Sequence, residues 1–168
     1  MISEMRGLFE QGRRSEGDSR MTTASVVVLL LGLYIAAGAR ADVWINEFVA
    51  DNDGGVRTQA GVAADWIELA NDSSQPVDLS GWHLTDRADA PTKWRIPDST
   101  IIAAGGYLVV FADSSAHSIT NSELHANFSL SADGEYLGLI RPDGVTVAHE
   151  FAPRFPPQLR DVSYGRGT

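Results

Sequence analysis

Two acidic stretches carry the oxygen ligands that a calcium ion prefers. Asp51-Asn52-Asp53-Gly54 gathers oxygen donors on one loop, and Asp86 and Asp89 form a second pair. Calcium takes about six to eight oxygen ligands, and an EF-hand loop is closed by a Glu at its twelfth position. No Glu occupies that position after Asp51. We therefore interpret both stretches as solvated acidic turns and predict no metal site, with weak calcium binding near Asp51 and Asp53 left open.

The remaining reactive side chains show no catalytic pattern. The chain has no cysteine, which excludes thiolate zinc ligands and thiol nucleophiles. The histidines have neither His-x-His nor His-Glu-x-x-His spacing: His83, His117, His125 and His149. No nucleophile elbow and no phosphate-binding glycine loop is present. We predict no catalytic residue, no cofactor and no enzymatic activity, and we expect His83 and His149 to face solvent.

Lys93 is the only lysine in the chain. Its amine could form an amide cross-link with an asparagine side chain, for which the candidates are Asn71, Asn121 and Asn127. A lysine beside a strand is more simply explained as a charge that keeps a sheet edge from pairing with another chain. We adopt this simpler interpretation.

Length and charge limit the class of protein. The chain has 168 residues, of which 43% are hydrophobic, and a formal net charge of -9. This length predicts one domain, and the composition is ordinary for a globular chain. A strongly acidic surface repels phosphate backbones, so we predict no nucleic-acid partner.

Residues 1–41 form a predicted targeting region. An apolar stretch over residues 26–37 lies between Arg20 and Arg40 and is followed by the small-x-small pattern Ala39-Arg40-Ala41. This pattern is typical of a signal peptide, and we predict cleavage after Ala41 and secretion to the cell envelope or medium. A retained membrane anchor is the alternative, and Met21 is an alternative first residue.

The rest of the chain predicts short strands separated by turns. Residues 43–49 alternate, with Val43 and Ile45 on one face and Glu47 as a further candidate for it. Other runs cover residues 65–70, 82–85, 93–96, 107–112, 135–140 and 146–151. The sequence Pro142-Asp143-Gly144 predicts a hairpin turn between the last two. Many short strands at this spacing favour an all-β sandwich over residues 42–151, with an irregular tail over 152–168.

Several motif residues have structural explanations. We expect the indoles of Trp66, Trp82 and Trp94 to pack in the core or at its edge, with a sugar-binding face as the alternative. We expect positive φ angles at three turn glycines: Gly81, Gly105 and Gly106. Asn71 and Asp78 are expected to hydrogen-bond loop backbone.

The order of these motifs resembles the lamin tail domain family. Residues 45–48 resemble its opening strand, 65–71 its D-W-I-E-L-x-N strand, and 78–86 its D-L-S-G-W-x-L-x-D segment. Residues 102–108 match I-P-A-G-G-Y-L except for Ala103, and 130–135 and 161–166 resemble later segments. The resemblance implies an immunoglobulin-like antiparallel β-sandwich of the bacterial exported branch.

The same resemblance implies a non-catalytic module that binds or tethers. The expected partner is an envelope or extracellular protein or a glycan, with membrane contact only if the signal segment is retained. The alternative is an accessory domain truncated from a larger exported enzyme, such as a nuclease, a phosphatase or a CotH-type kinase-like protein.

Overall fold

The computed structural model describes residues 43–115, 119–120 and 122–165, and these residues contain strands and no helix. They belong to one compact unit. No helix that could cross a membrane occurs among them. The predicted signal peptide, its cleavage site, His117 and Asn121 lie outside the described residues.

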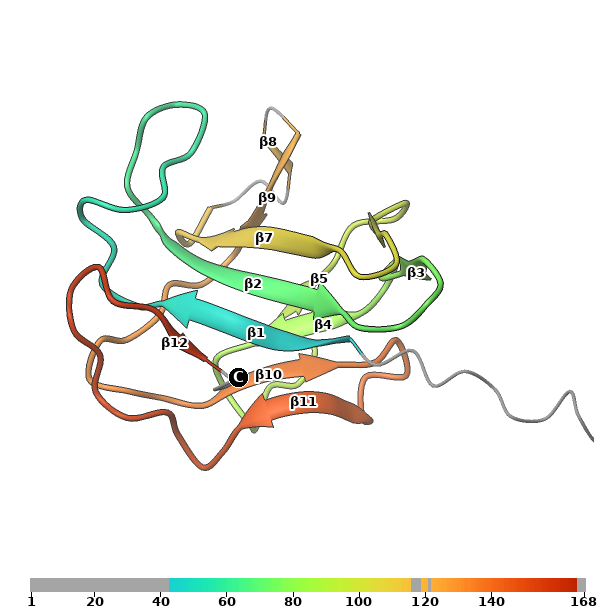
Figure 1. The fold of residues 1–168 in the computed structure, drawn as a ribbon. Coiled ribbons are helices and arrows are strands. Elements are labelled where there is room, and N and C mark those ends of the chain that lie inside the picture. The colour runs from blue at the N-terminus through green and yellow to red at the C-terminus, as the bar shows by residue number, and fades with distance from the viewer. Residues whose placement is uncertain (1–42, 116–118, 121, 166–168) are drawn as a thin grey trace, which may run out of the picture. The chain divides into compact units, whose positions relative to one another are not determined.

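The larger sheet has six strands in the order β12-β1-β2-β7-β9-β8 (Figure 1). Their bounds are β1 Val43–Val49, β2 Asp65–Asn71, β7 Tyr107–Ala112, β8 Ile119–Thr120, β9 Glu123–Ala126 and β12 Tyr164–Gly165. The predicted runs 65–70 and 107–112 agree with β2 and β7. The nearly continuous apolar run of β7 is explained by its interior place between β2 and β9.

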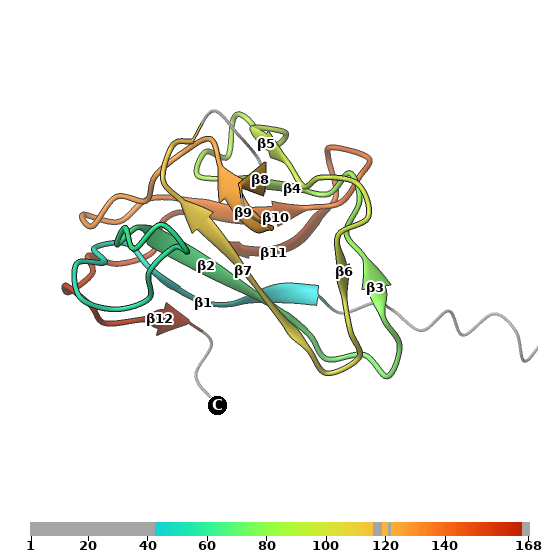
Figure 2. The same cartoon turned by 90° about the horizontal axis from the view of Figure 1, so that it is seen from above.

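A second sheet has four strands in the order β11-β10-β4-β5. Its strands are β4 His83–Thr85, β5 Trp94–Arg95, β10 Leu137–Ile140 and β11 Val147–Phe151. A short pair, β3 Val77–Asp78 and β6 Ile101–Ile102, lies at one end of the unit (Figure 2). The two large sheets face each other, which confirms the predicted all-β sandwich.

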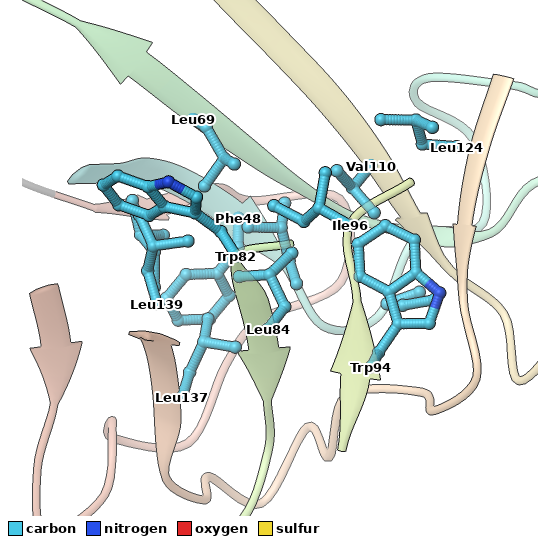
Figure 3. Close-up of a cluster of buried hydrophobic side chains, with 14 of the residues drawn as sticks. Phe48, Leu69, Trp82, Leu84, Trp94, Ile96, Val110, Leu124, Leu137 and Leu139 are labelled. Atoms are coloured by element: carbon cyan, nitrogen blue, oxygen red, sulfur yellow. The ribbon is translucent and has the colours of Figure 1, made fainter. Parts of the chain in front are cut away.

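The core lies between these two sheets. Trp82 and Trp94 are buried at opposite ends of one cluster, with Leu84 and Ile96 between them (Figure 3). Phe48, Leu69 and Val110 enter the same cluster from the six-stranded sheet. Because both indoles are almost fully buried, neither can form a sugar-binding face, and the prediction that they pack in the core is confirmed.

The alternation predicted for β1 is wrong at one position. The pairing of β1 with β2 shifts between Ile45 and Glu47, so Asn46 is an extra residue in the ladder. Such a bulge changes the face of the sheet toward which each following side chain points. Phe48 therefore enters the core with Ile45, whereas Glu47 is only half-buried on the other face.

The prediction of an antiparallel sandwich is wrong for one pair of strands. β7 and β9 pair in parallel, with Val110 opposite Leu124. β8 lies between them in the sequence and pairs antiparallel with β9 at the outer edge. In the sheet, β9 therefore lies between β7 and β8, although it follows β8 in the sequence. It runs parallel to β7.

The predicted hairpin between β10 and β11 is confirmed. The Arg141 N–H donates to the Thr146 carbonyl (2.8 Å), and Gly144 has φ 72°. Gly81 and Gly105 also have the predicted positive φ. The prediction is wrong for Gly106, whose φ is not positive; its need for glycine is spatial, because an added Cβ would lie 3.0 Å from the Ala103 carbonyl oxygen.

The segment after residue 151 is part of the folded unit. Its backbone is irregular up to β12, as predicted, but Phe155 is only 1% exposed. Phe155 N–H donates to the Glu135 carbonyl (2.8 Å), and Asp161 N–H donates to the Asp51 carbonyl (2.9 Å). Tyr164 then pairs with Phe48. The segment after residue 151 therefore packs against the sandwich, because an irregular chain can still fill an open edge of the core.

Candidate binding surface

At one end, the face of the six-stranded sheet that points away from the core is covered. Val49, Ala64, Trp66 and Phe111 form a second buried cluster there, separate from the main core. The loop over residues 51–64, between β1 and β2, adds Ala64 to this cluster (Figure 1). Trp66 is therefore buried as predicted, but on the opposite side of the sheet from Trp82.

The other end of this face carries two aromatic side chains in one row. Trp44 lies opposite Ala70, and Ala70 lies opposite Tyr107. Directly paired residues of adjacent strands project to the same face, and two strand spacings separate the outer ones by roughly 10 Å. Trp44 is half-buried and Tyr107 is 64% exposed.

Polar groups lie beside this aromatic row. Glu47 on β1 pairs with Glu68 on β2, and Glu68 pairs in turn with Val109 on β7. The Asn46 amide donates to Glu68 Oε1 (2.8 Å), so the bulge residue fixes one carboxylate. We define the outer face as Trp44, Asn46, Glu47, Glu68, Tyr107 and Val109. Flat aromatic surface beside carboxylates and an amide can stack on a partner and hydrogen-bond it.

Sequence reasoning did not identify this surface. Trp44 alternates with Val43 and Ile45, and Tyr107 begins an apolar run, so both signals were present. The pairing of β1 with β2 and of β2 with β7 decides that the two rings share a row, and register is not visible in either segment alone.

The first acidic stretch contacts Arg160 and Asp161 of the C-terminal tail. Arg160 lies 3.4 Å from a carboxylate oxygen of Asp51 and of Asp53. Asp161 Oδ1 accepts the N–H groups of Asp53 (2.7 Å) and Gly54 (2.8 Å). These donors hold the pKa of Asp161 below its usual value. The loop therefore binds residues 160–161 of the tail. The acidic composition of the loop did not reveal this contact.

The second acidic pair is divided between two cations. Asp86 accepts from Lys93, and Asp89 accepts from Arg87 (2.8 Å). Within residues 43–115, 119–120 and 122–165, no group of three or more His, Asp or Glu side chains is arranged to hold a metal ion.

The histidines lie apart, and one prediction about them is wrong. His83 is 9% exposed rather than solvent-facing. Burial lowers its pKa, which favours the neutral ring. His149 is half-buried with its ring edge-on to Phe151. His125 is buried, its Nδ1 2.8 Å from Asp113 Oδ2, and its ring stacks on Phe111. Strand alternation identifies a face of a sheet but not whether loops cover it.

The predicted loop anchors are confirmed. The Asn71 amide donates to three carbonyls, those of Gln75, Ile102 and Ala103, at 2.8–3.1 Å. Asp78 Oδ1 accepts the Ser80 N–H (2.8 Å). Asn71 is thus a buried structural residue, and Lys93 Nζ lies instead beside Asp86.

The sandwich, the loop anchors Asn71 and Asp78, and the outer face are those of an immunoglobulin-like module. Its outer face is aromatic and acidic. The family model of the lamin tail domain matches residues 36–151. The chain belongs to the lamin tail domain family. The comparison with curated proteins finds no match.

Proposed function

We propose that this chain is a non-catalytic, exported module that binds an envelope or extracellular protein or glycan through the outer face. The observation that carries the proposal is the exposed Tyr107 in one row with Trp44, beside Glu47 and Glu68. A tyrosine ring left largely in water does not contribute to the core, whereas large exposed rings are typical of recognition surfaces.

Export is supported by the apolar stretch before Ala39-Arg40-Ala41. The exported chain would need no disulfide for stability, because a domain of this size buries enough surface to be stable without one. The tethering role would place an acidic module outside the membrane with the outer face toward its partner.

Binding of the full chain to isolated envelope fractions and to a glycan panel tests this proposal. Tyr107→Ser should weaken binding at least tenfold without changing the melting temperature, because the ring is exposed. Val145→Ser is the matched control, since Val145 is 75% exposed on the hairpin of the other sheet. Equal binding by all three proteins, or loss only in the Val145 variant, contradicts the proposed surface.

An accessory role beside an exported enzyme is the second candidate function. It is supported by the docked tail, which ends in β12 at the edge of the six-stranded sheet and would transmit a fixed orientation to a following domain. Genomic sequence downstream of residue 168 tests it: an in-frame hydrolase or kinase-like region favours this role.

A further inference from the structure

The outer face is built from two neighbouring rows of side chains across β1, β2 and β7. Directly paired residues make up each row: Trp44, Ala70 and Tyr107 in the aromatic row, and Glu47, Glu68 and Val109 in the acidic row. The rows are two residues apart along β2, which is about 7 Å. A group bound between the rows therefore has aromatic rings on one side and carboxylates on the other.

The bulge at Asn46 puts the acidic row on this face. Side chains alternate between the two faces along a strand, so Trp44 and Glu47, three residues apart, would point to opposite faces in a regular ladder. The extra residue brings both to the outer face and keeps the Glu47 carboxylate out of the core. The Asn46 amide then donates to Glu68 Oε1 (2.8 Å). Bulges that redirect a side chain in this way are common beside functional sites.

Glu47 and Glu68 lie opposite each other without a cation. Directly opposed side chains have their Cβ atoms roughly 5 Å apart, and like charges in that position repel. Among the residues that the structure describes, no ion pair includes either carboxylate. Gly165 pairs with Glu47 from β12 and has no side chain that could cover it. The acidic row therefore carries negative charge that the described part of the chain does not compensate.

This charge pattern selects among possible partners. A second copy of the same face, a nucleic acid or an anionic membrane would bring negative charge against the two carboxylates. A neutral glycan would cover them without a counter-charge, and covering a charge in that way costs free energy. A basic side chain offsets the charge. An arginine guanidinium can bind a carboxylate through two hydrogen bonds and can also stack on an aromatic ring.

We propose that the outer face binds an extended, arginine- or lysine-containing segment of an extracellular protein, with a basic side chain over Glu47 and Glu68. This inference rests on the proposed binding function and selects a basic protein segment as its partner. Side chains on one side of an extended segment recur about 7 Å apart. A basic residue over the acidic row therefore places the residue two positions away over the aromatic row, against Tyr107 and Trp44.

Titration of the purified full chain with a synthetic peptide tests the proposal. The probe is a short peptide with arginine and tyrosine two positions apart in a glycine–serine background, and its control carries citrulline, the uncharged analogue of arginine. The arginine peptide should shift the amide NMR signals of β1, β2 and β7 and bind at least tenfold more tightly than the citrulline peptide. Added salt should reduce this difference, because ions screen exposed charges. Equal binding by both peptides, or binding by neither, overturns the proposal.

Two variants that each remove one negative charge locate the binding. Glu47→Gln should weaken binding of the arginine peptide at least tenfold, and its melting temperature should equal or exceed that of the wild type, because the repulsion with Glu68 is lost. Asp133→Asn, an exposed change on the turn before β10, is the matched control and should bind like the wild type. Equal weakening in both variants would reflect net charge alone and overturns the assignment to the outer face. A lower melting temperature in Glu47→Gln would show a structural role instead.

Failure of this inference is distinguishable from failure of the proposed function. If Tyr107→Ser weakens binding to envelope fractions or to a glycan while the arginine peptide does not bind, the outer face is a binding surface and its partner is not a basic segment. If neither Tyr107→Ser nor Glu47→Gln changes binding to any of these probes, both proposals are wrong.

Discussion

The rings of Phe48 and Phe155 pack against each other with their centroids 4.6 Å apart. Phe48 lies in the first strand, and Phe155 lies four residues beyond the end of the family match at 151. Phe48 also contacts Phe151 and Tyr164. The first strand and the last segment of the chain therefore close the sandwich together.

Phe155→Ala should destabilise the fold by about 3–5 kcal/mol, because the ring is fully buried and its loss leaves a cavity. Leu159→Ala in the same tail should cost less than about 0.5 kcal/mol, because Leu159 is 73% exposed. Urea melts of both variants measure the difference. Equal stabilities would mean that the tail does not contribute to the core.

Gly134→Ala should destabilise far more than Gly61→Ala. Both glycines have positive φ, so both substitutions strain the backbone. An added Cβ at Gly134 would collide with the Phe155 carbonyl oxygen, whereas nothing lies within 4 Å at Gly61. Thermal melts compare the pair, and hydrogen exchange of residues 152–165 should rise only in the Gly134 variant. Similar exchange in both variants would argue against close docking of the tail.

Trp82→Ala should cost about 3–5 kcal/mol, and Trp66→Ala should cost less. Trp82 lies in the main core between two sheets, whereas Trp66 lies under the loop over residues 51–64, which can collapse onto a smaller side chain. Chemical denaturation of both variants checks the order. A larger loss for Trp66 would show that the loop is as rigid as the sheets.

The pKa of Asp143 is lowered to about 2 by its hydrogen bonds with Thr146 and the backbone of the hairpin turn. A depressed carboxyl pKa adds stability above the unfolded value of about 3.9, and this contribution is lost as the pH falls through about 2. Thr146→Val should raise the pKa of Asp143 toward its ordinary value. A carbon-13 NMR titration measures it, and an unchanged pKa would assign the effect to backbone donors alone.

Millimolar calcium should leave the melting temperature unchanged relative to chelator. Arg160 already lies against the carboxylates of Asp51 and Asp53, where the ion would have to bind. A micromolar site would raise the melting temperature by at least several degrees at this excess of ligand. A rise of that size that Asp53→Ala abolishes would make this loop a calcium site.

The sequence by itself determined seven of the strand segments, the hairpin at Pro142-Asp143-Gly144 and the family, but not the short strands β3, β6, β8, β9 and β12. These features depend on short-range rules: alternation along a strand and the φ preferences of turn residues. Their physical causes act within a few residues, so they are visible in the order of residue types.

Only the tertiary structure decided which side chains meet across the chain. One extra residue at Asn46 turned Phe48 inward, and strand register placed Trp44 and Tyr107 in one row. Docking of the tail buried Phe155 and brought Arg160 to Asp51 and Asp53. These contacts join residues up to 109 positions apart. No local pattern encodes them, because they follow from how the two sheets and their covering loops fill one core.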